Sequence, residues 1–539
     1  MRPEATAAPV PVADETTRKI SLQALVPYLI GLLFFVLALR GVDATDVIDT
    51  DAARHAMNGA FFYDLIRTGN WAHPIEYAKQ YYAQYPALSM PYHPPLFPAV
   101  EALFFAIFGV RLLTARMAVA VSVAISSVLL YRLVRTTFGR DLIAACVTIT
   151  TLSLWTFQFV ARDVMLEFPA LALTLAAIYC IRGLEESFPL RYALLFAGLS
   201  AAAVWTKQHA VFLGAVPVLY AVLTKRWRRF FEAPFWVGLL LFGGTVFALI
   251  RLSRMFHGTG VDQMSTSASD LYWIVTRTLP AYFEWIAEDL KGLPGVFAVC
   301  AIGTYLMGLR KRDSNRPKSA LYFAWMIAMC ALLIDLGPVT PRYFFFLLPP
   351  VIAVGYVWLF HGCRWLWGER TAHFALVGFT IAWFVMGLFI PMDFLTGPGT
   401  AAAAVVRGVP TRVLYAGAAD GNFAFSVRTL DPNLQVTVIS AGKVSPRVLD
   451  ESPLEAFCKK YGIEWVVFEN APGRTFWAKF YSELKTAGVL ERSVPLRSTR
   501  QRWRSGAIEV YHFSVAQNHP GGVLQLPVPN IGTSIPLKL

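Results

Sequence analysis

The sequence is short of charge: only 15% of its 539 residues are Asp, Glu, Lys or Arg, whereas soluble domains carry about 25%. Apolar residues make up 56% of the chain, and 40 Phe and 15 Trp are more than a soluble core of this size needs. Aromatic residues in such numbers suit lipid-facing helices and the interfacial belts of a membrane protein. The composition therefore excludes an ordinary soluble domain and predicts an integral membrane protein.

Other absences narrow the chemistry. The six cysteines contain no CxxC pair, so neither a zinc site nor a disulfide framework is indicated. No glycine-rich phosphate loop and no His/Asp cluster with metal-ligand spacing are present, so we expect no cofactor and no metal ion. The net charge of +13 would suit nucleic acid, but the basic residues lie in short loops between apolar runs, as in proteins anchored in membrane lipids. We therefore predict no nucleic-acid partner.

Apolar runs long enough to span a membrane follow one another along most of the chain. A span needs about 20 apolar residues, and such runs occur at 21–40, 112–134, 141–160, 164–182, 191–206, 209–224, 233–253, 294–309, 319–337, 343–361 and 371–391. A shorter run at 96–110 is ambiguous. With the N-terminus inside and 96–110 as a helix on the outer side, every short basic loop falls on the cytoplasmic side, as the positive-inside rule requires. If the run at 96–110 spans the membrane, every later loop moves to the opposite side and the positive-inside rule fails, unless a second apolar run also divides into two parts.

This threading divides the chain into a cytoplasmic tail at 1–20, a membrane domain at 21–395, an extracytoplasmic domain at 405–514 and a flexible tail at 515–539. The membrane domain includes two long outer loops, 41–95 and 254–293. In the C-terminal domain, alternating strands and helices are predicted at 411–416, 434–440, 452–461, 464–469, 475–487 and 507–514. The predicted fold class is an all-α polytopic membrane domain of about 11–13 transmembrane helices with a small α/β domain at its C-terminus.

Two carboxylates stand out on the outer side. Asp51 opens a helical stretch directly after the first span, where a base for an acceptor hydroxyl beside a lipid-borne donor would have to lie. Capping of this helix by Thr50 or Asp51 is the structural alternative. Glu167 lies about one turn into an apolar helix, at a depth where a carboxylate is expensive and therefore a functional candidate. Its structural alternative is an ion pair with Arg162.

Two cations lie on the same predicted face. Lys207 and Arg342 are each the only basic residue of an outer turn, and they could hold a lipid phosphate and offset the charge of a leaving group. Snorkelling to the interface is the structural alternative. A lone histidine, His93, precedes two prolines at the end of the first loop and could face a phosphate or a sugar. The convergence of two carboxylates and two cations from four separate turns predicts an active site on this face.

The order of several short motifs resembles the dolichyl-phosphate-mannose protein mannosyltransferase and aminoarabinose transferase superfamily of bacteria, which are glycosyltransferases of family 39 and 83 type with the GT-C fold. The resemblance covers about residues 20–390. The motifs are Asp51-x-x-Arg54-His55-Ala56, His93-Pro-Pro-Leu, a long apolar stretch ending in Phe-Gly-Arg140, Ala161-Arg162-x-x-x-Leu-Glu167-x-Pro169, Thr206-Lys207 and Pro341-Arg342-Tyr343.

The resemblance implies inverting transfer of a sugar from a polyprenyl-phosphate donor to a lipid, protein or glycan acceptor, without nucleotide or metal, at the outer face of the plasma (inner) membrane. It implies that Asp51 is the general base, that Glu167 replaces the usual second Asp, and that Lys207 and Arg342 bind the lipid phosphate. The other residues predicted to bind substrate are Tyr343, His93, Arg54 and Arg162. Most relatives carry Glu after the first Asp, where this chain has Ala52, so Asp49 remains an alternative base.

Two other functions remain open on the sequence. A glycan polymerase of the same fold would use the same residues. A transporter or lipid flippase would show repeated halves and charged or broken helices near the bilayer midplane. The sequence shows no repeat, and its unusual charges gather at one predicted face.

Overall fold

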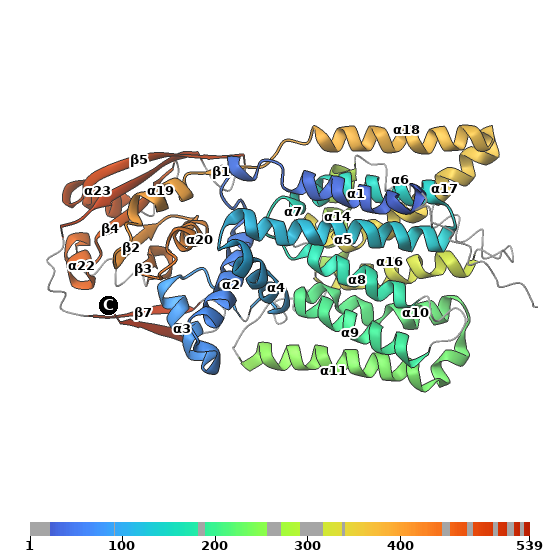
Figure 1. The fold of residues 1–539 in the computed structure, drawn as a ribbon, viewed down its shortest axis with the longest axis horizontal. Coiled ribbons are helices and arrows are strands. Elements are labelled where there is room, and N and C mark those ends of the chain that lie inside the picture. The colour runs from blue at the N-terminus through green and yellow to red at the C-terminus, as the bar shows by residue number, and fades with distance from the viewer. Residues whose placement is uncertain are drawn as a thin grey trace, which may run out of the picture.

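The membrane domain is a bundle of helices, and the α/β domain sits at one end of it, in a computed structural model of the full chain (Figure 1). The structure describes residues 22–90, 92–181, 189–255, 271–290, 316–336, 340–444, 453–471, 478–499, 505–514, 522–528 and 533–538. The tail at 1–20, the predicted span at 294–309 and much of the loop at 254–293 lie outside these residues. The region where the bundle meets the C-terminal domain is called the junction below.

The bundle is built from the predicted apolar runs. Every run within the described residues forms helix: α1 (Leu22–Ala38), α5 (Leu112–Phe138), α6 (Asp141–Ser153), α7 (Trp155–Ala161), α8 (Glu167–Ile181), α9 (Leu190–Thr206), α10 (Val216–Leu223), α11 (Ala233–Met255), α16 (Arg316–Leu336), α17 (Leu348–Trp367) and α18 (Glu369–Leu388). By length and composition, five helices in this part of the chain can cross a membrane, or six if the pair α6 and α7, bent by 69°, is one span. The bundle also contains shorter apolar helices, among them α8 and α9. The prediction of an all-helical, polytopic membrane domain is confirmed.

The run at 96–110 forms α4 (Leu96–Phe108), which has 13 residues. A helix of that length is too short to span a bilayer, which needs about 20 residues. It packs against α2 (Thr50–Arg67) and α5 close to the junction (Figure 1). The structure thus agrees with the assignment of this run to one side of the membrane.

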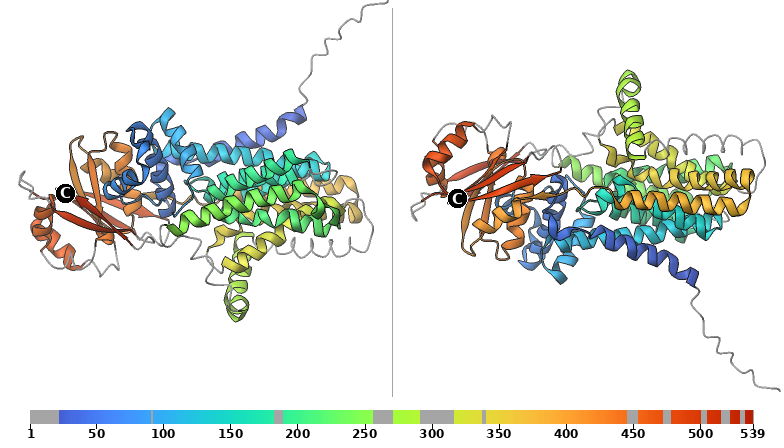
Figure 2. Two further views of the ribbon diagram at one scale, coloured as in Figure 1. Left: turned by 90° about the horizontal axis from the view of Figure 1, so that it is seen from below. Right: turned by 90° about the horizontal axis from the view of Figure 1, so that it is seen from above.

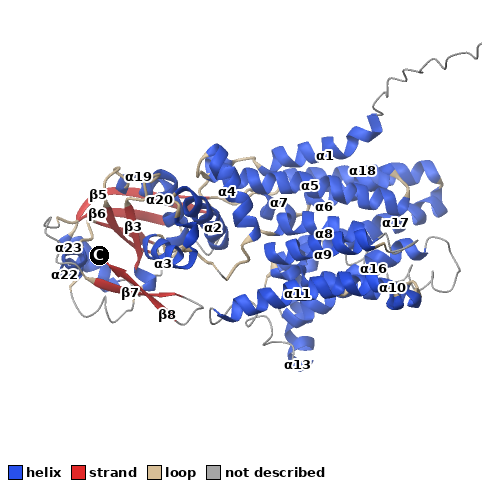
Figure 3. Ribbon diagram, turned by 60° about the horizontal axis from the view of Figure 1, so that its bottom comes forward, coloured by secondary structure: helices blue, strands red, loops and turns tan. Residues whose placement is uncertain are grey.

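The first loop, 41–95, is largely helical and lies at the junction. It contains α2 and α3 (Pro74–Gln84), which face the C-terminal domain (Figure 3). A second helical segment projects from the side of the bundle (Figure 2): it comprises α13 (Leu271–Trp273), the π-helical turn η6 (Ile274–Thr278) and α14 (Leu279–Leu290). Tyr282 of α14 anchors this segment by donating a hydrogen bond to the carbonyl oxygen of Leu333 (2.7 Å).

The C-terminal domain is a six-stranded mixed sheet with strand order β1-β5-β6-β4-β2-β3. The strands β2 (Thr411–Ala416), β3 (Val436–Ser440) and β4 (Trp465–Asn470) are parallel, whereas β5 (Val489–Ser498) and β6 (Gly506–His512) add on as antiparallel strands. Helices α20 (Asp420–Leu430), α22 (Leu454–Tyr461) and α23 (Ala478–Ala487) accompany the sheet. The predicted α/β domain is confirmed, and each strand and helix predicted in it is present within a few residues.

Four details differ from the prediction, the first being the helix α20, which was not predicted. The sheet begins at β1 (Leu395–Thr396), which pairs with β5, so 395–405 with α19 (Pro398–Val405) joins the C-terminal domain. The strand β5 was not predicted because most of its side chains are exposed and lack apolar alternation. The predicted flexible tail contains an antiparallel hairpin of β7 (Val523–Val528) and β8 (Thr533–Lys538).

Candidate active site

Asp51 lies in the first turn of α2, and its side chain contacts other predicted site residues. The helix is capped by Asp49, whose Oδ1 accepts a hydrogen bond from the backbone N–H of Asp51 (2.9 Å). Neither of the predicted caps, Thr50 or Asp51, therefore performs this role. The Asp51 carboxylate instead accepts a hydrogen bond at Oδ2 from Arg342 (2.6 Å), and Oδ1 lies 3.8 Å from the guanidinium of Arg54.

The four charged residues singled out in the sequence form one chain of ion pairs. Arg342 comes from the 3-10 helix η7 (Pro341–Phe346), Glu167 begins α8, and Lys207 follows the end of α9. Lys207 donates to Glu167 Oε1 (2.7 Å), and Arg342 Nε lies 3.9 Å from the same oxygen. Since Arg342 also holds Asp51, the sequence-based expectation that these groups lie close together is confirmed. Glu167 is fully buried, whereas 25% of the Asp51 side chain remains exposed.

One predicted site residue lies apart from this chain of ion pairs. Arg162 donates to Gln158 Oε1 (3.0 Å), and the charges that act on it are those of Arg40 and Asp393. The alternative that Glu167 forms an ion pair with Arg162 is wrong, because Glu167 pairs with Lys207 instead, and the substrate-binding role of Arg162 stays a prediction.

Aromatic and imidazole rings surround the ion pairs. The Tyr343 ring centroid lies 5.9 Å from Lys207 Nζ and 5.9 Å from the guanidinium carbon of Arg342, and the ring of His209 lies 4.3 Å away. On the Asp51 side, the rings of His55 and His93 meet edge to face at 4.3 Å. Of these residues, the sequence pointed to His93 and Tyr343 and missed His55 and His209, which no charge pattern marks.

These histidines are neutral groups with spare hydrogen-bonding capacity. Burial lowers the pKa of His55 to about 3 and that of His93 well below its ordinary value. Within the described part of the chain, His55 Nδ1, His93 Nε2 and both ring nitrogens of His209 have no hydrogen-bond partner. A buried polar atom without a partner is unfavourable by about 1–3 kcal/mol, so these atoms are suited to meet polar groups of a ligand.

The charge on Asp51 is set by its neighbours. Burial alone would raise its pKa, but the neighbouring groups, chiefly Arg342, together outweigh burial and hold the pKa of this carboxyl below its ordinary value. Asp51 is therefore ionised at neutral pH when it is paired with Arg342. In that state it is a weak base, because a carboxylate that a cation stabilises has little tendency to take a proton.

A second buried network supports the start of α2. Asp163 Oδ2 accepts a hydrogen bond from the backbone N–H of Asp49 (2.8 Å), and its Oδ1 accepts from Val164 N–H (3.0 Å). Arg116 of α5 is almost fully buried and its charge acts on both Asp163 and Asp46. The sequence analysis missed this network, although Asp163 sits in the same turn as Arg162. It fixes the turn from which Asp51 projects.

The stability of the Asp163→Asn variant relative to the wild-type protein is expected to rise between about pH 4 and about pH 7. Burial raises the pKa of Asp163 from 3.8 to about 6, so between these values the folded protein binds more protons than the unfolded chain. Ionisation of Asp163 then disfavours folding as pH rises through this window, by up to about 3 kcal/mol. Asn carries no charge and keeps one oxygen for the Asp49 N–H, while the loss of the acceptor for the Val164 N–H is the same at every pH. Thermal unfolding in detergent across this pH range measures the effect, and a pH-independent difference would contradict it.

No three His, Cys, Asp or Glu side chains are arranged to hold a metal ion in the ranges that the structure describes. The ion-pair chain, with neutral rings around it, is built to take an anion beside a carboxylate. It offers two cations for the anion and one partly exposed carboxylate, Asp51, next to them.

The family model of dolichyl-phosphate-mannose-protein mannosyltransferase matches residues 92–251. No curated protein matches the chain by sequence.

Solved structures share the fold over most of the chain. ArnT from Cupriavidus metallidurans bound to undecaprenyl phosphate is similar with a TM-score of 0.54 at 15% identity, covering 90% of this chain and 97% of that one. Its apo state gives a TM-score of 0.55 at 15% identity, with the same shares covered. The archaeal oligosaccharyltransferase AglB from Archaeoglobus fulgidus, in complex with an inhibitory peptide and a dolichol-phosphate, gives 0.51 at 12% identity, covering 92% of this chain and 75% of that one. The chain therefore shares the fold of ArnT and AglB over most of its length.

Proposed function

We propose that the chain transfers a sugar from a polyprenyl-phosphate donor to a hydroxyl or amine acceptor, with inversion, at the junction. The observation that carries the proposal is the chain of ion pairs that joins Asp51, Arg342, Glu167 and Lys207. It combines a partly exposed carboxylate with two cations in one buried setting. The fold supports it too, since ArnT and AglB structures with this fold hold undecaprenyl phosphate and dolichol-phosphate.

The donor phosphate would bind to Lys207 and Arg342. Both cations are largely buried, and an anion in such surroundings interacts with them more strongly than in water. The Tyr343 ring lies beside both cations and offers a flat wall next to the phosphate. The unpartnered nitrogens of His55 and His93, close to Asp51, suit the hydroxyls of the sugar, each neutral imidazole having one donor and one acceptor. Arg54 borders the exposed side of Asp51, where the acceptor would enter.

Donor binding would also activate the base. In the resting site Arg342 is paired with Asp51, which holds the pKa of Asp51 down. A phosphate that takes hydrogen bonds from Arg342 competes with that pairing, and the pKa of Asp51 then rises towards a value useful for proton transfer. The base would thus become effective only when a donor is present.

The chemical step would proceed as an in-line displacement. Asp51 accepts the proton of the acceptor group, whose heteroatom forms a bond to the anomeric carbon on the face opposite the phosphate. The bond from that carbon to the phosphate oxygen breaks, and its electron pair leaves on the polyprenyl phosphate. Lys207 and Arg342 stabilise that charge, as preorganised donors do at a developing oxyanion. Proton, bond and charge balance without an added cofactor.

We infer that the junction faces the outside of the plasma (inner) membrane. The helix α5 begins at the junction and ends at the opposite end of the bundle, where its last turn carries Arg135 (Figure 1). Arg140, at the start of α6, lies at that same opposite end. Basic residues concentrate at the cytoplasmic ends of spans. A transporter or flippase would instead require charges near the midplane, whereas this chain of ion pairs lies where several spans end.

Purified protein in detergent is expected to consume a polyprenyl-phosphate-linked sugar and to release polyprenyl phosphate, without a nucleotide sugar or an added metal ion. Lipid extracts fractionated by mass, with loss of one lipid-linked sugar measured on incubation, would identify the donor and then the acceptor. Turnover of a nucleotide sugar in place of a lipid-linked one would overturn the proposal. Movement of an intact lipid-linked sugar across a vesicle bilayer without its cleavage would favour the flippase instead.

A further inference from the structure

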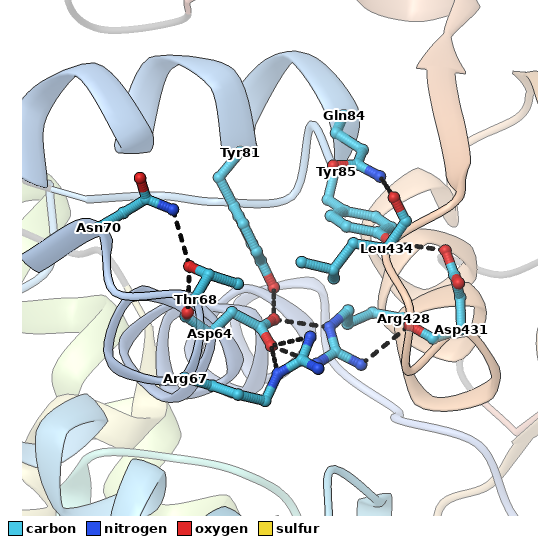
Figure 4. A network of polar contacts seen from close by, with 10 residues as sticks. All are labelled: Asp64, Arg67, Thr68, Asn70, Tyr81, Gln84, Tyr85, Arg428, Asp431 and Leu434. Carbon is cyan, nitrogen blue, oxygen red and sulfur yellow. Dashed lines mark hydrogen bonds and ion pairs between the residues drawn. The ribbon is translucent and has the colours of Figure 1, made fainter. Parts of the chain in front are cut away.

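A buried ion pair far from the proposed chemistry ties the first loop to the C-terminal domain. Arg428 of α20 donates from Nε to Asp64 Oδ2 (2.7 Å) and from a terminal nitrogen to Asp64 Oδ1 (2.6 Å), so the pair is bidentate (Figure 4). The two side chains are 2% and 0% exposed. They are 364 residues apart in the sequence. Nothing in the proposed reaction uses either of them.

Further groups complete this contact (Figure 4). Tyr81 of α3 donates to Asp64 Oδ2 (3.0 Å), and Tyr85 donates to Asp431 Oδ2 (2.9 Å) beyond the end of α20. Arg428 also donates to the carbonyl oxygen of Asp431 (3.2 Å). A second cation, Arg67, reaches Asp64 at 3.3 Å from the solvent side and is 37% exposed. Each carboxylate oxygen of Asp64 therefore has a partner from another element.

Stability alone does not explain such a pair. Two buried charges lose hydration on burial, and an apolar pair of similar volume is often as stable or more stable. What a bidentate pair adds is a fixed relative orientation of the two elements that carry it. The elements here are α2 and α20, which suggests that their alignment matters.

The alignment of α2 determines where Asp51 lies. Asp51 is in the first turn of α2 and Asp64 is near its other end, about 20 Å away at the helical rise of about 1.5 Å per residue. The start of α20 lies against the start of α2, since Gly421 packs beside Ala53 and Asn422 donates to the carbonyl oxygen of Val47 (2.6 Å). The helix α20 thus contacts α2 at both ends.

We propose that the C-terminal domain positions the base, with Arg428 and Asp64 acting as a clamp that fixes α2 and thereby the distance from Asp51 to Arg342. This inference rests on the proposed role of Asp51. It makes the C-terminal domain part of the catalytic machinery without placing any of its residues in contact with substrate. Arg428 and Asp64 are positioning residues in this view.

The first test compares two arginines that share one carboxylate. Arg428→Met should lower kcat by about 10²-fold, because an error of about 1 Å in the placement of a reacting group has that effect. The KM for the donor should stay within about twofold, since Lys207, Arg342 and Glu167 belong to the membrane domain. Arg67→Ala removes the exposed partner of the same Asp64 and should leave kcat within about twofold. An unchanged kcat in Arg428→Met would overturn the proposal.

The second test separates misplacement from misfolding. A Cβ built at Gly421 lies 3.6 Å from the Cβ of Ala53, within the range of about 3.5–4.5 Å that a disulfide needs. The substitutions Ala53→Cys and Gly421→Cys are added to the Arg428→Met variant, and the two cysteines should cross-link on oxidation. The cross-link should restore kcat to within about threefold of the value for a reference protein that has both cysteines and keeps Arg428. Reduction should abolish that restoration. A disulfide that forms without restoring kcat would refute the clamp.

The same cysteine pair also tests the clamp without any transfer assay. With Arg428 present, the two helices are held together and cross-linking should be fast. With Arg428→Met, it should slow by about tenfold or more as α2 gains freedom. Equal cross-linking rates would reject the clamp even if the chemistry proposed for Asp51 is correct. A slowed rate with an unaltered reaction in Asp51→Asn would instead reject the base and keep the clamp.

Discussion

Replacing Asp51 by Asn is expected to lower the transfer rate by about 10²–10⁴-fold, the usual contribution of a general base, while the protein stays folded and binds donor. The amide oxygen of Asn can still accept the hydrogen bond from Arg342, and Glu167 still balances that cation. The helix cap is unaffected because Asp49, not Asp51, accepts the N–H at the start of α2. The variant therefore removes the proton acceptor and little else. Single-turnover kinetics with a lipid-linked donor measure the loss.

The matched control is Asp49→Asn, which tests the rival base. Asn caps a helix about as well as Asp, so this variant should keep the start of α2 and stay within about threefold of the wild-type rate. A large loss in Asp49→Asn with a normal rate in Asp51→Asn would transfer the role of base to Asp49. Large losses in both would show that the position of the first turn, and not one carboxylate, limits the reaction.

The sequence predicts those site residues whose charges are unusual among apolar runs. Lys207 and Arg342 each stand alone in a turn between apolar runs, and Glu167 lies inside one. Such residues are unfavourable in a bilayer unless they pair or act, and the structure pairs them. Their positions follow from hydropathy and loop charge alone, which depend only on neighbouring residues in the chain.

The missed features depend on contacts between distant segments. Arg116 is hidden within the apolar run at 112–134, and only the fold brings it to Asp163 and Asp46. The pair of Asp64 and Arg428 joins segments 364 residues apart, and neither residue is unusual in its local pattern. The hydrogen bond of Arg162 to Gln158, in place of an ion pair with Glu167, is likewise a contact that the folded chain alone shows. Local sequence thus predicts the helices and the unusual charged residues, whereas tertiary packing determines which residues those charges contact.

The second large effect is expected at Arg342, the residue shared by both carboxylates. Arg342→Lys keeps the charge but replaces a planar fork of donors by a single ammonium group, which cannot hold Asp51 or Glu167 and a phosphate in the same geometry. If Arg342 stabilises the leaving phosphate, kcat should fall by about 10²–10³-fold, as on removal of one oxyanion donor.

The effect on kcat distinguishes Arg342 from a simple anchor. Lys207, which is bonded to Glu167 and would contact the phosphate before and during the reaction, should affect donor KM more than kcat when it is replaced by Ala. Arg162→Lys makes the same chemical change as Arg342→Lys at an arginine outside the chain of ion pairs, and it should stay within about twofold of wild type. Steady-state kinetics over a range of donor concentrations separate the two parameters. If Arg342→Lys raised only KM and left kcat intact, Arg342 would bind the phosphate without stabilising its departure, and the resting pair with Asp51 would be the main reason for its position.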